Sequence, residues 1–399
     1  MIRLLAIFLF LTSLSGFSAH AAVDLGIDVL KSQGFAPLAG KRVGLVTNQT
    51  GVDSSGTKTR VLLRKATNFQ LVALYSPEHG IDGTVLAGKY VPSRKDAATG
   101  LVVHSLYGPT RKPTPEMLRG IDVLVYDMQD IGVRSYTYVS TMAKCMEACG
   151  EQRIPFVVLD RPNPLGGQRV EGPGIEEKWK SFVGQLPVPY LHGMTVGELA
   201  KMANAHGWAG SRCQLTVVPM QGWNRDMTWS RTGLRWVQTS PNIPRATSVA
   251  YYAATSIFGS LEGAALDVGI GTGEPFQCAG KCNMDSGAFV RELRACGLRG
   301  SLVEPYTRKE FGGARLSLSA DSDMNLAALN IHLLSAAQRN SRGSIFARYR
   351  DPDGIFWKIY GSTGLRAQIE KGVSPAAIIA GWDSGVARFR SARQAYLLY

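Results

Sequence analysis

Leu71-Val-Ala-Leu-Tyr-Ser-Pro-Glu-His-Gly80 is an apolar run of strand length that ends in a turn carrying a carboxylate beside an imidazole. A buried strand here would deliver Glu78 and His79 to its carboxyl-terminal end, where open α/β sheets form their ligand crevices. Glu78 is therefore the first catalytic candidate, with His79 as a possible tuning group. The alternative for this stretch alone is an ordinary surface turn with a solvated carboxylate.

Similar apolar, β-branched runs recur on both sides of this stretch, separated by polar or amphipathic segments such as 136–150. Near-continuous apolar strands that alternate with helices are typical of a parallel sheet covered on both faces. The sequence thus predicts an α/β fold, with a Rossmann-like N-terminal domain over residues 23–185 and a smaller α+β domain over 186–399. The runs that we interpret as strands of the first domain are 42–47, 71–75, 101–106, 123–126 and 156–159.

Hydrogen-bonding side chains follow each of these predicted strands. Because the carboxyl ends of parallel strands share one edge of a sheet, their clustering there predicts a site for a polar substrate. Some of these residues are equally expected to cap helices or to form internal ion pairs. The candidate substrate-binding residues are Asn48, Gln49, Asp127, Asp130, Arg134, Tyr136, Asp160, Arg161 and Asn163.

A second carboxylate, Glu171, follows the fifth strand in a turn-rich loop that could fold back over the crevice. Two carboxyl groups in different environments are what glycoside hydrolysis needs, one as acid and the other as base or nucleophile. The spacing in sequence leaves the distance between Glu78 and Glu171 open, as well as which of them donates the proton. Glu262 is a third carboxylate, expected to bind substrate or to be structural.

Several cofactor and catalytic motifs do not occur. The loop after the first strand and the stretch Gly269-Ile-Gly-Thr-Gly273 both lack the G-x-G-x-x-G fingerprint, and neither is a P-loop. No G-x-S-x-G elbow is present, which disfavours serine chemistry. The six cysteines lack the spacing of a zinc site, so disulfides or buried thiols are the expectation. We therefore predict neither a cofactor nor a metal.

The first 22 residues have an early arginine, an apolar core and a small-x-small ending at Ala19-His20-Ala21. This pattern predicts a cleaved secretory signal, because the apolar core is shorter than the roughly 20 residues of a spanning helix. The mature protein is then expected to be periplasmic or secreted, with no integral membrane segment. The formal net charge of +13 suits an anionic partner, but the charges are dispersed, which disfavours a nucleic-acid groove.

The chain resembles the NamZ family of exo-β-N-acetylmuramidases across essentially all of its mature length. The motifs that carry the resemblance are Tyr75-Ser-Pro-Glu-His-Gly80, Asp127-Met-Gln-Asp-Ile-Gly-Val-Arg-Ser-Tyr-Thr-Tyr138, Asp160-Arg-Pro-Asn-Pro-Leu-Gly-Gly167, Val170-Glu-Gly-Pro173 and Tyr396-Leu-Leu-Tyr399. The segment after Glu274-Pro-Phe276, which holds Cys278 and Cys282 in an expected loop, matches more loosely.

This resemblance implies a hydrolase that removes terminal N-acetylmuramic acid from the non-reducing end of peptidoglycan fragments. Its partners would be muropeptides or saccharides of N-acetylmuramic acid and N-acetylglucosamine. Since muramic acid carries a lactyl carboxylate, Arg134, Arg161 and His79 are reasonable anion partners. Trp223, Trp229 and Trp236 could stack on sugar rings or pack in the core.

Two other classes of protein stay open on sequence grounds. One is a periplasmic binding protein for muropeptides or another anionic solute, which would need polar ligand groups but no catalytic pair of carboxylates. The other is a hydrolase that cleaves a different peptidoglycan bond, such as an ester or an amide. Loss of turnover with retained binding in a Glu78→Gln variant separates a glycosidase from the first of these.

Overall fold

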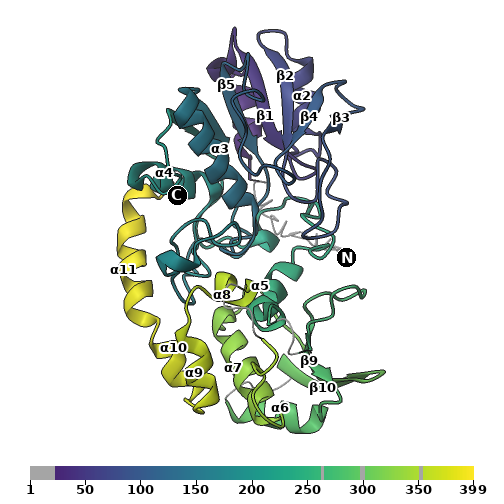
Figure 1. Cartoon of the computed structure of the whole chain (residues 1–399). Coiled ribbons are helices and arrows are strands. Elements are labelled where there is room, and N and C mark those ends of the chain that lie inside the picture. The colour runs from purple at the N-terminus through teal and green to yellow at the C-terminus, as the bar shows by residue number, and fades with distance from the viewer. Residues whose placement is uncertain (1–22, 262–264, 297–301, 350–353) are drawn as a thin grey trace, which may run out of the picture.

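The computed structural model describes residues 23–261, 265–296, 302–349 and 354–399. The predicted signal segment and Glu262 lie outside these described residues. Figure 1 shows the N-terminal sheet in the upper half of the molecule and most of the C-terminal helices in the lower half. The last long helix, α11 (Asp383–Arg393), runs along one side and returns the chain end to the upper half, beside α4 (Val196–His206).

The upper half contains a seven-stranded sheet in the order β3-β4-β2-β1-β5-β6-β7. All neighbouring strands are parallel except β3, which pairs antiparallel with β4 at one edge. The order reverses direction at β1, since the chain leads from β1 to β2 on one side and later reaches β5 on the other. The strands are β1 (Arg42–Thr47), β2 (Gln70–Ser76), β3 (Arg94–Lys95), β4 (Val102–Ser105), β5 (Val123–Asp127), β6 (Phe156–Leu159) and β7 (Leu215–Val218).

Helices cover both faces of this sheet, as the apolar strands predict. Along β5, Val123 and Val125 pack with α1 (Gly26–Ser32) and α2 (Thr59–Lys65), whereas Leu124 and Tyr126 pack with α3 (Tyr138–Gln152) and α4. Successive strand residues point to opposite faces, so only a run that is apolar at every position can serve two helix layers. The predicted α/β class with a covered parallel sheet is confirmed.

The lower half combines an antiparallel sheet with helices. Its strand order is β10-β11-β9-β8, and α5 (Ser248–Gly259) and α7 (Leu326–Arg339) pack in the same core. The remaining elements are β8 (Leu266–Asp267), β9 (Cys278–Cys282), α6 (Ser286–Ala295), β10 (Val303–Arg308), β11 (Phe311–Leu316), α8 (Ile355–Tyr360), α9 (Gly364–Glu370) and α10 (Pro375–Ala380). Mixed strands and helices agree with the expected α+β character.

Local differences from the sequence predictions concern short elements. The stretch around Cys278 and Cys282 is not a loop but β9, which pairs with β8 and β11. The sequence predicts a loop here because a glycine and a lysine interrupt the apolar pattern of the stretch. The upper sheet also takes in β7 at 215–218, which lies beyond the expected domain boundary at residue 185.

None of the six cysteines forms a disulfide, and all six lie within the described ranges. Cys145 and Cys149 are buried on α3, while Cys282 is exposed at the end of β9. Burial raises the pKa of the Cys145 thiol, which keeps it protonated and inert.

In the part of the chain that the structure describes, no helix is both long enough and apolar enough to cross a membrane.

Buried arginines join the two halves through main-chain carbonyl groups. Arg134, only 1% exposed, donates from Nη1 to the carbonyls of Pro173 and Val188 and from Nη2 to those of Ile359 and Tyr360 at the end of α8. A guanidinium group offers a fixed fork of donors, so one side chain fixes three separate segments.

Replacing Arg134 with methionine is expected to lower the free energy of unfolding by at least about 3 kcal/mol, because buried carbonyl oxygens lose charged donors. Urea denaturation followed by circular dichroism measures this change. The matched control is Arg119→Met, whose side chain is 75% exposed, and for which we expect a change within about 0.5 kcal/mol. Equal effects of the two substitutions would contradict the joining role of Arg134.

Candidate active site

Glu78 stands at the carboxyl end of β2 with both of its carboxylate oxygens occupied. Oε1 accepts a hydrogen bond from the Gly88 main-chain N–H at 2.8 Å, and Oε2 accepts one from the Thr137 hydroxyl at 2.7 Å. The residue is 7% exposed. Two donors from different loops fix the orientation of the carboxylate, which is what a reacting group requires.

His79 shapes the loop that holds Glu78. Its backbone is left-handed, with φ of 69°, and Gly80 follows with φ of 78°. Its Nδ1 lies 2.7 Å from the carbonyl of Val85, to which it donates in the corresponding tautomer, and the Val85 N–H donates back to the His79 carbonyl. This closed turn leads the chain to Gly88. His79 therefore stabilises the turn that follows Glu78, with backbone strain of the kind that clusters at functional sites.

Tyrosine side chains surround Glu78. Burial and the Glu78 charge together raise the pKa of Tyr107, and they act in the same direction on Tyr138, whose neighbour Tyr136 adds to the effect. Burial raises the pKa of Tyr252 on α5, and the Glu78 charge adds to this effect. The Tyr252 hydroxyl lies 3.1 Å from that of Ser135. The C-terminal half thus reaches the site through α5, and these phenols stay protonated as possible hydrogen-bond donors.

Tyr136 and Tyr138 lie at the start of α3, which begins at Tyr138, so only Tyr138 belongs to the helix. Their rings meet edge to face at 4.8 Å. The Tyr136 hydroxyl donates to the Thr239 hydroxyl at 2.9 Å, and the Tyr138 hydroxyl donates to the Thr239 carbonyl. Both tyrosines therefore hold the segment around Thr239 beside the site.

A buried ion pair forms the floor at this sheet edge. Arg161 donates from Nε and Nη2 to the two carboxylate oxygens of Asp127, at 2.6 and 2.9 Å. The Thr59 hydroxyl at the start of α2 also donates to Asp127. Asn48 accepts from the N–H and hydroxyl of Thr50, which shapes the loop after β1. Three of the predicted binding residues, Asn48, Asp127 and Arg161, therefore stabilise the loops at this edge of the sheet through contacts within the protein.

Other predicted site residues serve the fold. Asp160 accepts hydrogen bonds from Thr195, Gly197 and Tyr399 and so caps α4, and burial raises its pKa to about 6. Asn163 bridges Leu165 and Met194. Arg134, expected to pair with an anion, has both terminal nitrogens on main-chain carbonyls instead.

Glu171 has different partners from Glu78. Its Oε1 pairs with Arg169, and its Oε2 accepts from the Ala327 N–H at 3.2 Å, at the start of α7. Burial raises its pKa against the opposing effect of Arg169. Among the described residues, the two carboxylates share no hydrogen-bond partner. Glu171 thus joins the 165–171 loop to the lower half.

The tryptophans pack mainly with one another and with the core. Trp229 and Trp236 meet edge to face at 4.8 Å, while Trp223 packs against Tyr399 at 5.1 Å. Trp223 is buried with Val23 and Met220. Among the described residues, these three tryptophans therefore do not form one open platform for stacking on sugar rings. Trp229 does line a pocket at the sheet edge.

Some residues around Glu78 have no signal in the sequence. Thr137 lies within a quoted motif, yet a threonine beside two tyrosines gives no hint of a carboxylate partner. Gly88 lies later in the same loop as Glu78, whereas Thr239 and Tyr252 come from distant segments that only the folded chain brings to the site. Gln49, predicted from its place after β1, donates from Nε2 to the carbonyls of Gln238 and Thr239 at 2.8 and 2.9 Å.

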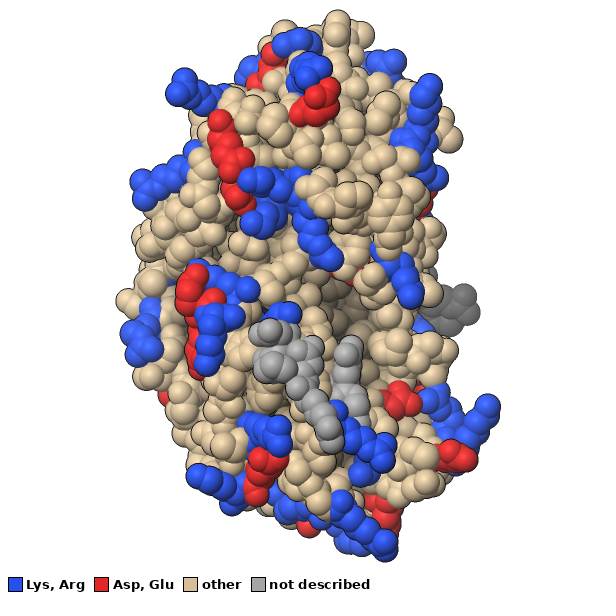
Figure 2. Space-filling view, viewed as in Figure 1, with Lys and Arg blue, Asp and Glu red and all other residues tan. Residues whose placement is uncertain are grey.

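Figure 2 shows the surface hollowed between the sheet-bearing upper half and the lower half. On this face, basic and acidic side chains lie interspersed, so the positive net charge does not form a single continuous patch here. No group of three or more histidine, cysteine, aspartate or glutamate side chains in the described ranges could hold a metal ion. The fold and site define an α/β protein with a positioned carboxylate at the edge between its two halves.

Comparisons with known proteins agree with that class. The family descriptions "Exo-beta-N-acetylmuramidase NamZ, N-terminal" and "Exo-beta-N-acetylmuramidase NamZ, C-terminal" match residues 43–247 and 250–399. The chain therefore belongs to the NamZ family. The two matched segments meet between residues 247 and 250, and the domain boundary expected from the sequence lies earlier, at residue 185.

Individual relatives cover nearly the whole chain. A curated relative, "Peptidoglycan beta-N-acetylmuramidase NamZ" of Bacillus subtilis (strain 168), is 38% identical over 391 residues, which are 94% of this chain and 91% of the relative. Two crystal structures of DUF1343 family proteins from Bacteroides fragilis NCTC 9343 match with TM-scores of 0.87 and 0.74 at 39% and 31% identity. Each match covers 95% of this chain and 99% of the other.

Asp130 behind the site carries a strongly perturbed carboxyl group. It is 4% exposed, Oδ2 accepts from the Gly132 N–H at 2.8 Å, and Oδ1 has no partner in the described chain. Burial raises its pKa to about 7. Because the pKa of Asp130 is higher in the folded than in the unfolded state, the folded state holds the proton more tightly. The contribution of Asp130 to the free energy of unfolding therefore falls as the pH rises from about 4 to about 7.

Asp130→Asn keeps an acceptor for Gly132 but removes this ionisation. We expect the free energy of unfolding of the variant, relative to wild type, to increase by about 1–3 kcal/mol between pH 5 and pH 8. Urea titrations at several pH values measure it. Asp323→Asn, at an exposed position, is the control, and an identical pH dependence for both variants would contradict the buried titration of Asp130.

Proposed function

We propose that this protein is an exo-acting glycoside hydrolase that releases terminal N-acetylmuramic acid from the non-reducing end of peptidoglycan fragments, with Glu78 as its principal catalytic carboxylate. The observation that carries the catalytic assignment is the position of Glu78: buried at the carboxyl edge of the sheet and held by Gly88 and Thr137. The relationship to the Bacillus subtilis peptidoglycan β-N-acetylmuramidase supports the choice of substrate.

Glycosidic bond cleavage passes through an oxocarbenium-like transition state. A carboxylate fixed beside the anomeric carbon can stabilise the positive charge or exchange the proton of the leaving oxygen. Thr137 and Gly88 hold the Glu78 carboxylate so that little reorientation is needed during the reaction. Tyr107, whose pKa is raised by burial and by the Glu78 charge, supplies a protonated phenol group for a sugar hydroxyl.

The place of action that we propose is the periplasm or the cell exterior. The signal-like pattern over residues 1–22 supports it, as does a substrate that belongs to the cell wall. Because muramic acid carries a carboxylate, the positive net charge of +13 would favour the encounter with such fragments.

Glu78→Gln is expected to lower kcat by at least about a thousandfold, because the amide can neither exchange a proton nor balance a positive charge. Binding of the substrate should change by less than about threefold, since the shape is retained. The assay incubates the full chain with a disaccharide of N-acetylmuramic acid β-linked to N-acetylglucosamine and detects released muramic acid by mass spectrometry. The reversed disaccharide should stay intact.

Glu177→Gln is the matched control, since the side chain of Glu177 is 84% exposed on the surface. It should keep wild-type turnover. If wild type binds the disaccharide without cleaving it, a binding protein replaces the hydrolase as the conclusion. If binding falls in step with turnover in Glu78→Gln, the catalytic assignment of Glu78 fails while the activity stands.

Glu171, the partner carboxylate expected from sequence, is tested separately. Its contacts with Arg169 and the start of α7 favour a role in joining the two halves. We expect Glu171→Gln to lower the free energy of unfolding by about 1–2 kcal/mol and to change kcat by less than about fivefold. A loss of turnover as large as that of Glu78→Gln, with stability unchanged, would instead assign Glu171 as the second catalytic carboxyl group.

A further inference from the structure

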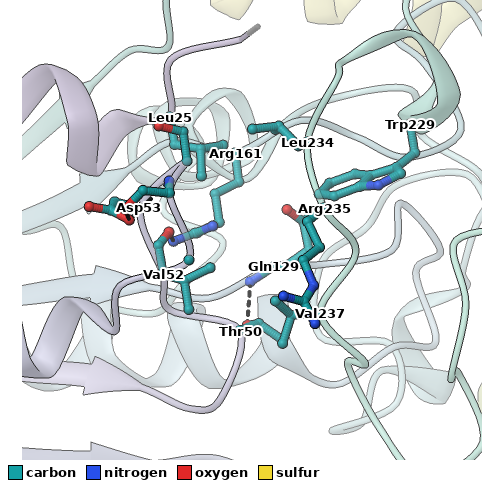
Figure 3. Close-up of a pocket in the computed structure, with 13 residues that line it drawn as sticks. Leu25, Thr50, Val52, Asp53, Gln129, Arg161, Trp229, Leu234, Arg235 and Val237 are labelled. Atoms are coloured by element: carbon teal, nitrogen blue, oxygen red, sulfur yellow. Dashed lines mark hydrogen bonds between the residues drawn. The ribbon is translucent and has the colours of Figure 1, made fainter.

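A pocket lies beside the Glu78 site at the point where the order of the sheet reverses. It is bounded by the loop after β1 on one side and by the segment 229–237 on the other, as Figure 3 shows. Gln129 after β5 and Arg161 after β6 form its base. In open α/β sheets this switch point, between the loops of β1 and β5, is where ligands bind.

Two arginines contribute to this pocket from different elements. Nε and Nη2 of Arg161 are used by Asp127 and Val52, while its Nη1 has no hydrogen-bond partner in the described ranges. Arg235 is exposed and forms neither an ion pair nor a hydrogen bond with any described residue. An arginine without a protein partner at the mouth of a pocket is suited to a carboxylate ligand.

The acidic side chain at the pocket does not cancel this charge. Asp53 lines the same pocket, but its oxygens accept from Lys31, Ser55 and Thr57. These hydrogen bonds outweigh its burial and lower the pKa of its carboxyl group. Asp127 is likewise paired with Arg161. Arg235 is therefore the cation at this pocket that lacks a protein counter-ion.

A buried acceptor and an apolar wall complete the pocket. Gln129 is 3% exposed, its Nε2 donates to the carbonyls of Asp130 and Pro162, and its Oε1 has no partner. An unpaired buried acceptor costs free energy unless a ligand N–H or O–H reaches it. Trp229, Leu234 and Val237 supply apolar surface, as ligand pockets generally do around a few polar groups.

This pocket and the Glu78 site share one wall. Val237 lines the pocket, and the next two residues accept hydrogen bonds at their carbonyls from Gln49. The Thr239 carbonyl also accepts from Tyr138, whose hydroxyl feels the charge of Glu78. Residues 237–239 therefore connect the wall of the pocket to the side chains around Glu78.

We propose that this pocket binds the carboxylate-bearing arm of an acidic amino sugar, with Arg235 as the residue that recognises the carboxylate and Gln129 as the acceptor for a neighbouring N–H or O–H. The ligand class is a carboxylate on a short apolar arm, as in the lactyl ether of N-acetylmuramic acid. The choice of that sugar rests on the proposed function. Arg235 then determines specificity for muramic acid over N-acetylglucosamine, which lacks the arm.

The test measures binding of three probes: N-acetylmuramic acid, its methyl ester and N-acetylglucosamine. Isothermal titration calorimetry gives the affinities, and quenching of tryptophan fluorescence reports on Trp229. Arg235→Gln should weaken binding of N-acetylmuramic acid about tenfold, because a charge-assisted hydrogen bond is lost. Affinities for the methyl ester and for N-acetylglucosamine should change by less than about twofold. Arg291→Gln, at an exposed position on α6, removes the same charge elsewhere and should leave all three affinities unchanged.

Unchanged binding of N-acetylmuramic acid in Arg235→Gln, or an equal loss for all three probes, would overturn the proposal. Its failure is distinguishable from failure of the proposed function. If wild type cleaves the disaccharide but Arg235→Gln keeps its KM and its preference for muramic acid, only the pocket assignment falls. If wild type does not cleave it while N-acetylmuramic acid still binds through Arg235, the pocket stands as an acidic-sugar site and the hydrolase is rejected.

Discussion

The Asp127–Arg161 pair is the contact on which the functional edge of the sheet depends. Both side chains are almost fully buried, and the two hydrogen bonds between them are parallel, as in the strongest arginine–carboxylate pairs. Burying two charges costs desolvation energy that only such geometry and further hydrogen bonds offset. The Thr59 hydroxyl, which donates to Asp127, and the Val52 carbonyl, which accepts from Arg161, supply those bonds, while the Thr47 hydroxyl donates to the main-chain carbonyl of Asp127. The ends of β1, β5 and β6 and the start of α2 are thereby held in one arrangement.

The proposed pocket lies on this neutral pair, since Arg161 forms part of its base. Glu78 belongs to the β2 side, where donors from two loops fix its carboxylate, and Arg235 belongs to the side of β5 and β6. Since the floor itself carries no net charge, it leaves the proposed catalytic carboxylate, Glu78, and the proposed recognition residue, Arg235, free to act separately. The segment around Thr239 separates them and is held by Gln49, Tyr136 and Tyr138. The acidic arm of the proposed substrate would bind on the Arg235 side.

The sequence predicts the sheet well because its strands are apolar at every position and end in polar motifs. The same logic predicts Glu78 at the carboxyl end of β2, where the structure has it, and its catalytic role stays a prediction. The role of each single residue is harder to predict from the sequence. An arginine in a polar motif looks the same whether it binds an anion or, like Arg134, main-chain carbonyls. β9 was missed because a strand of the pattern Cys-Ala-Gly-Lys-Cys has no apolar alternation. Partners such as Thr239 and Tyr252 depend on tertiary contacts that no local pattern encodes.

The arginines that join the two halves bind backbone rather than side chains. Arg393, like Arg134, donates to main-chain carbonyls, in this case those of Gly167, His192 and Gly193. Such contacts depend on the path of the bound segments but not on which side chains those segments carry. Evolution can therefore replace many residues along these segments while the two halves keep the same relative position. Substitutions in the segments at this junction therefore need not change the geometry of the cleft between the two halves.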